Sequence, residues 1–154
     1  MQLDSEENRI AVIEAFPELE FDISFKITSN PDPSYNCIAW AANYSNFWWQ
    51  PSLNSPYDGT FWPLKSLDND VNALIGVFKS LKYEICDDWM KEPFFKKVAL
   101  YGNEEGKYTH ASRQLQTGIW TSKLGQDFDI SHSTPFKIEG DAYGKVIIFM
   151  RKKM

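Results

Sequence analysis

The pattern of apolar and polar positions divides the chain into a helical first half and a strand-rich second half. Residues 5–15 and 66–81 repeat apolar side chains every three or four positions, which predicts two amphipathic helices, with Ser66 as a possible N-cap of the second. A helix over about 36–44 has little polar surface, so we expect it to be central and buried. Residues 21–28 alternate, which predicts a half-buried strand or extended segment.

Strand-like segments follow the last of these helices. They are residues 83–86, 97–101, 107–115, 119–124 and 145–150. The turns at 102–106 and 116–118 are too short for parallel crossovers, so the sheet should be antiparallel. The sequence therefore predicts an α+β fold in a single domain over residues 1–154, with N-terminal helices packed on a C-terminal antiparallel sheet.

Charge and composition narrow the class of protein. A net charge of −5 and a pI near 5.0 argue against nucleic-acid binding and allow a basic protein partner. The first residues lack the apolar stretch of a signal peptide, and no apolar run could span a bilayer. We expect a cytoplasmic protein without membrane contact, although export without an N-terminal signal stays open. The two cysteines and two histidines lack metal-ligand spacing, and the sequence shows no glycine-rich phosphate loop, so neither a metal nor another cofactor is expected.

The residues around Cys37 suggest a thiol nucleophile. Asn36 can cap the central helix, which would place Cys37 at the positive end of the helix dipole, where a thiolate is favoured. His110 lies on a later strand and is the candidate base. Cys86 stands among three acidic residues that raise a thiol pKa, so we interpret it as structural. Iodoacetamide should therefore modify Cys37 before Cys86.

A third residue would have to orient the histidine. The hairpin over 107–124 should return Ser122 toward His110, and strand alternation favours Ser122 over Lys123 as the residue that faces the site. A serine hydroxyl can accept the imidazole N–H but cannot stabilise an imidazolium as a carboxylate does. The alternatives are Gln114, Asp127 and Asp129 for this position, and His132, expected in a loop, as the base if His110 is remote.

The order of a Cys-bearing helix and a His-bearing strand resembles the papain-like cysteine hydrolases, in particular the compact bacterial NlpC/P60- and CHAP-like amidases. The segments YNCIAWA, THASRQL, WTSKLG and YGKV also resemble a group of bacterial proteins without an established activity. The resemblance implies a papain-like fold and a thiol-dependent amide hydrolase (a peptidase, amidase or deamidase). It would act on a peptide, protein or peptidoglycan-type amide, with Cys37, His110 and Ser122 as its catalytic residues.

A second hypothesis is a non-catalytic protein-binding or immunity-type module on the same scaffold. The weak orienting capacity of Ser122 favours it, and the thiol pKa of Cys37 separates the two hypotheses. A value well below about 8.5 supports the hydrolase, and a higher one supports the module. The aromatic loop over 47–62 is interpreted as core and lid packing, or as a cleft wall that stacks on a peptide or sugar ligand.

Overall fold

The structure, a computed structural model, describes residues 3–154; Met1 and Gln2, where the predicted domain starts, lie outside the described residues. Three α-helices and a large sheet make it an α+β fold, as predicted. The helical elements are α1 (Glu6–Ala15), η1 (Pro17–Leu19), α2 (Cys37–Ala41), α3 (Val71–Ser80) and η2 (Pro135–Ile138). The strands are β1 (Lys26–Ser29), β2 (Trp48–Trp49), β3 (Thr60–Phe61), β4 (Glu84–Cys86), β5 (Phe95–Gly102), β6 (Tyr108–Gln114), β7 (Trp120–Lys123), β8 (Asp129–His132) and β9 (Lys145–Lys153).

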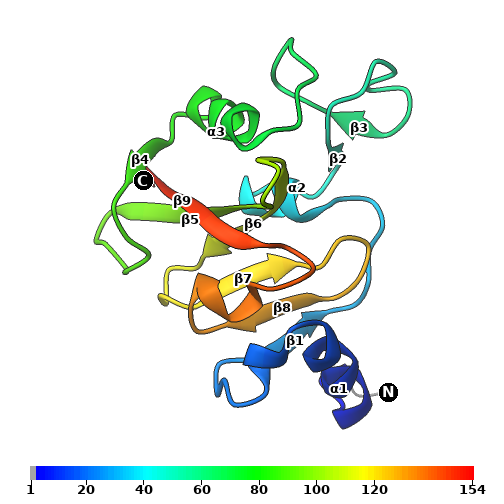
Figure 1. Ribbon diagram of the computed structural model, residues 1–154, viewed down its shortest axis with the longest axis vertical. Coiled ribbons are helices and arrows are strands. Elements are labelled where there is room, and N and C mark those ends of the chain that lie inside the picture. Colours follow the sequence, from blue (N-terminus) through cyan, green and yellow to red (C-terminus); the bar gives the residue numbers. More distant parts are fainter. Residues whose placement is uncertain (1–2) are drawn as a thin grey trace.

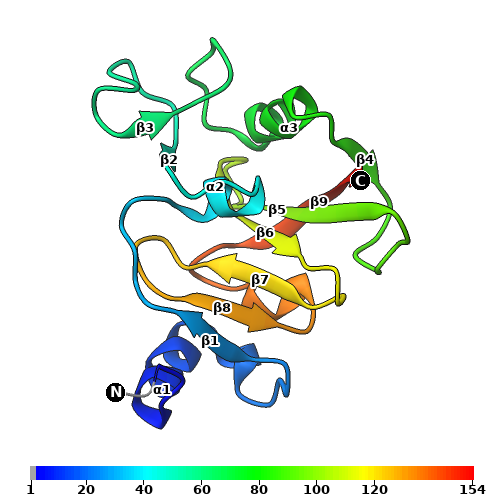
Figure 2. The same cartoon turned by 180° about the vertical axis from the view of Figure 1, so that it is seen from behind.

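Seven strands form one sheet in the order β1-β8-β7-β6-β5-β9-β4, and every pair is antiparallel, as predicted. The short strands β2 and β3 form a separate parallel pair. Helix α1 lies beyond β1 at one end of the molecule, and α3 lies with the β2–β3 pair at the other (Figures 1 and 2). Within the described chain, no helix is long and apolar enough to cross a membrane.

The sheet carries a hydrophobic core on each face. On one face, α2 and α3 pack against β-strand residues that include Leu100 and Ala111. On the other face, α1, η1 and η2 pack against Tyr101, Trp120 and Ile130. Side chains alternate between the two faces along each strand, and a core covers both faces. The central strands are therefore buried on both faces, and every residue of β7 and β8 is buried.

Three sequence predictions need correction. The segment over 21–28 becomes a strand only at Lys26, because Asp22 occupies the buried position while Phe21 and Ile23 project into solvent. Strand β8 replaces the loop expected around His132. The long helix begins at Val71 instead of residue 66.

The free edge of β1 is covered by two side chains. The Asp4 carboxylate accepts a hydrogen bond from the Ile27 N–H at 3.0 Å, and the Arg9 guanidinium donates to the Phe25 carbonyl at 2.9 Å. The two side chains also form an ion pair at 3.0 Å. Backbone groups that a further strand would otherwise pair are thus satisfied by the segment that contains α1.

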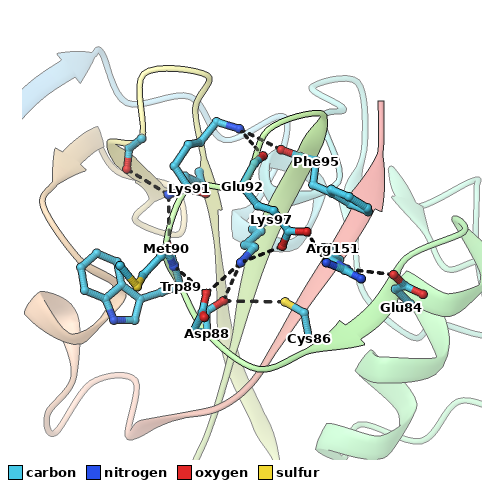
Figure 3. A network of polar contacts seen from close by, with 12 residues as sticks. Glu84, Cys86, Asp88, Trp89, Met90, Lys91, Glu92, Phe95, Lys97 and Arg151 are labelled. Carbon is cyan, nitrogen blue, oxygen red and sulfur yellow. Dashed lines mark hydrogen bonds and ion pairs between the residues drawn. The ribbon is translucent and has the colours of Figure 1, made fainter.

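A charged network holds the opposite side of the sheet together (Figure 3). Lys97 on β5 is only 2% exposed, and its ammonium donates to the Asp88 carbonyl at 3.1 Å and to the Asp88 carboxylate at 2.9 Å. Glu92 joins this lysine to Arg151 on β9, which in turn reaches Glu84 on β4 at 2.8 Å. The buried charge is therefore paired on several sides, as its burial requires.

The N-cap of α3 gives a direct test of the corrected helix boundary. The Asp70 carboxylate accepts a hydrogen bond from the Ala73 N–H at 2.7 Å. We expect Asp70→Ala to lower the free energy of unfolding by about 1 kcal/mol, the usual cost of losing an N-cap. Ser66 is the cap expected from the sequence, and Ser66→Ala should change the free energy of unfolding by less than about half of that amount. Chemical denaturation of both variants measures the difference, and equal losses would restore the longer helix.

Candidate functional site

Cys37 begins α2, as predicted. The Asn36 side chain caps the helix by accepting from the Ala39 N–H at 3.1 Å and also accepts from the Trp49 N–H at 3.1 Å. The first turn is thereby fixed to the aromatic loop. Cys37 packs with the α2–α3 core, the cluster that also contains Ala111 of β6.

His110 lies on the opposite face of β6. It neighbours Ala111 in sequence, and alternation turns its ring toward Tyr101, whose centroid is 5.1 Å away in the second core. Tyr143 stacks on the same ring at 3.9 Å. Both ring nitrogens are buried, and neither has a hydrogen-bond partner among residues 3–154. The structure therefore does not bring Cys37 and His110 together as a nucleophile and its base.

Ser122 pairs with the other histidine. Its hydroxyl lies 2.8 Å from His132 Nε2, and His132 Nδ1 lies 2.8 Å from the Thr134 carbonyl. A carbonyl can only accept, so Nδ1 carries the proton and Ser122 donates to Nε2. His132 is fully buried on β8 and is not the loop residue that the sequence suggested. The predicted orienting bond from Ser122 to His110 is absent from the described structure.

Lys123, and not Ser122, is on the side of α2. Thr121 accepts from Trp40 Nε1 of α2 at 3.1 Å, and the Lys123 ammonium lies 5.2 Å from the Tyr35 ring centroid. Ser122, between them, faces the second core. Of the two residues weighed from the sequence, Ser122 therefore lies on the side of His110, and Lys123 lies on the side of Cys37.

The other candidates for the third position are also engaged elsewhere. Gln114 donates to the carbonyls of Trp89 and Gly118, and Asp129 accepts from the Tyr35 hydroxyl at 3.2 Å. That carboxylate contributes, after burial, to raising the pKa of Tyr35 to about 12. Asp127 accepts from the Phe128 N–H in the loop before β8. None of these side chains is hydrogen-bonded to either histidine ring in the part of the chain described.

The pKa of the Cys37 thiol argues against a role as a nucleophile. Burial raises its pKa to about 11, although nearby backbone N–H groups, that of Ala111 first, and Lys123 act in the opposite direction. Burial likewise lowers the pKa of His110 well below its usual value, so this imidazole is neutral and cannot stabilise a thiolate as a cation. Cys86, 3.7 Å from the Asp88 carbonyl, also has a pKa raised by burial, partly offset by Lys97.

The aromatic loop divides between core and surface. Trp49 and Trp62 are buried in the α2–α3 core, whereas Trp48 is half-buried. Trp48 lines a cleft of about 620 Å³ with Phe47 and Gln126, but Cys37 and His110 do not line it. Among residues 3–154, no three His, Cys, Asp or Glu side chains gather closely enough to hold a metal ion.

Fold and site together describe an α+β domain with a capped cysteine helix but without an assembled cysteine–histidine pair. The family described as "Domain of unknown function (DUF7689)" matches residues 26–151, and the chain belongs to this family. A search of curated proteins and a search of solved structures found no significant match.

The buried histidines should make stability depend on pH. Burial lowers the pKa of His132 to about 4 and that of His110 well below its usual value. An unfolded imidazole titrates near about 6.5, so below that pH the unfolded chain binds more protons. The stabilisation is complete above about pH 6.5 and is lost as the pH falls toward about 4, with a slope of up to about 1.4 kcal/mol per pH unit for each histidine.

Urea denaturation between about pH 7.5 and 5 tests this assignment. His132→Asn keeps a donor for the Thr134 carbonyl but removes one titrating ring, so it should roughly halve the slope. Ser122→Ala, the matched control, should lower stability by about 1 kcal/mol while keeping the slope. An unchanged slope in His132→Asn would show that His132 is not a buried neutral base.

Proposed function

We propose that this domain is a non-catalytic protein-binding module rather than an amide hydrolase. The observation that carries the proposal is the position of His110 on the face of β6 that points away from α2. A general base must lie within hydrogen-bond reach of the proton it abstracts, and His110 forms no hydrogen bond within the described chain.

The state of the thiol supports the same proposal. A catalytic cysteine has a lowered pKa, whereas burial raises that of Cys37 to about 11. The helix N-terminus alone does not offset this burial. Asn36 and Cys37 instead serve the core, because the cap joins α2 to the aromatic loop and the thiol packs near β6.

A papain-like relationship is compatible with this function and forms the finer part of the proposal. A helix that begins at a cysteine and packs on an antiparallel sheet supports it. On this proposal, the scaffold has kept the helix while its histidines have become part of a second core. The net charge of −5 favours a basic protein as the partner.

Thiol reactivity tests the proposal. At about pH 7.5, iodoacetamide should modify Cys86 before Cys37, because a smaller fraction of Cys37 than of Cys86 is in the thiolate form. This order reverses the one expected from the sequence. In Cys86→Ser, the rate at Cys37 should rise with pH toward a midpoint near about 11. Peptide mapping by mass spectrometry measures both rates.

A substrate panel provides the decisive contrast. We expect no Cys37-dependent turnover of peptide, side-chain amide or peptidoglycan-type substrates. The unmodified chain and Cys37→Ala should therefore give the same rate on every substrate. A Cys37 midpoint below about 8.5, together with turnover that depends on Cys37, would overturn the proposal in favour of the hydrolase.

A further inference from the structure

The negative charge of the chain is concentrated in its first 25 residues. Of the 21 Asp and Glu residues, seven lie in this stretch, and of the 16 Lys and Arg residues only Arg9 does. The stretch therefore carries a net charge of −6, and the rest of the chain carries +1. It also precedes the region 26–151 that matches the family. The acidic character thus belongs to α1, η1 and the loop that follows them.

That loop presents two apolar side chains to solvent. Phe21 is 90% exposed and Ile23 is 92% exposed, although the neighbouring positions Leu19, Asp22 and Phe25 are buried. Scattered exposed apolar residues are ordinary on protein surfaces. Here two large ones flank the buried Asp22 in one loop, and we call them the Phe21–Ile23 tip.

Hydrogen bonds fix the tip in place. One oxygen of the buried Asp22 carboxylate accepts from the Ser24 N–H at 2.9 Å, and the other accepts from the Ser133 N–H at 2.8 Å and from its hydroxyl at 3.1 Å. The Ser24 carbonyl accepts from the Ser131 hydroxyl at 2.6 Å. A surface that is ordered before binding loses less conformational entropy on association, so these bonds favour recognition by the tip.

An acidic cleft begins at η1, the element that precedes the tip. A hollow of about 840 Å³ is lined by Glu18 of η1, by Thr134, which follows the Ser133 that holds Asp22, and by half-exposed Phe136 and Ile147. Its carboxylates are Glu18, Glu104, Glu139 and Asp141, against the ammonium groups of Lys137 and Lys145. The cleft therefore combines apolar surface with an excess of negative charge.

We propose that the Phe21–Ile23 tip and this cleft form the docking surface for a basic segment of a partner protein. Apolar side chains of the partner contact Phe21 and Ile23, and its lysines and arginines lie against the carboxylates of the cleft. Charge complementarity selects a cationic partner and increases its association rate. This inference rests on the proposed protein-binding function and assigns its surface and the chemistry of its partner.

Peptide selection tests the surface directly. A display library of random 12-residue peptides is selected on the immobilised full chain, and synthetic versions of the selected peptides are measured by fluorescence anisotropy. The selected peptides should carry a net positive charge and at least one bulky apolar residue. Phe21→Ser/Ile23→Ser should weaken their binding by about tenfold or more, as loss of a hot spot does. Glu18→Lys/Glu104→Lys should weaken it and reduce its salt dependence.

A matched control uses another exposed apolar pair. Leu53 is 89% exposed and Tyr57 is 97% exposed in the aromatic loop, so Leu53→Ser/Tyr57→Ser removes similar surface elsewhere. This variant should bind within about twofold of the unmodified chain, since its residues lie outside the proposed interface. Circular dichroism checks that every variant is folded; should the double variant at the tip unfold, Ile23→Ser alone replaces it.

Each result decides between distinct possibilities. Selected peptides without positive charge, or no peptide with a dissociation constant below about 100 μM, would overturn the assigned surface. Binding lost in Leu53→Ser/Tyr57→Ser and kept in the tip variant would also overturn it, yet would leave the binding function intact. The binding function itself is overturned by Cys37-dependent turnover together with a Cys37 midpoint below about 8.5, and none of these variants changes Cys37.

Discussion

The burial of β6 on both faces determines which side chains of this protein can meet. Ala111 packs against the side that carries α2, while its neighbours His110 and Ser112 belong to the side that carries Tyr101. Each face of β6 is a packed core, so a side chain on one face cannot turn to the other. Alternation therefore separates the imidazole of His110 from the helix that carries Cys37.

The second core contains several hydrogen-bonded polar groups. Tyr101 donates to the Pro135 carbonyl at 2.7 Å and pairs with the Ser112 hydroxyl, and the Ser122–His132 bond lies on the same face. Buried polar groups that are satisfied in this way specify one arrangement of the strands, because a shift of register would break several bonds together. The exceptions are the indole N–H of Trp120 and the ring of His110, which is neutral and enclosed by aromatic rings.

Local structure could be predicted from the sequence better than contacts between distant segments could. The cap at Asn36, the buried helix at Cys37 and the antiparallel hairpins that join β5, β6 and β7 each depend on a short stretch, and all were predicted. Strand β8 was missed because both of its faces are buried among polar residues, so Asp129–His132 shows no apolar alternation. Because β8 was missed, its hairpin with β7 and the bond between Ser122 and His132 that this hairpin positions were missed as well.

The side chains that cover β1 come from outside the region shared with the family. Asp4 and Arg9 occupy the backbone groups of Phe25 and Ile27, where an eighth strand would otherwise bond. A chain without this segment would present a bare strand edge beside an apolar core, the arrangement that templates strand addition and self-association. In such a chain the backbone groups of Ile27 would need another partner, such as a loop, a further strand or a second chain.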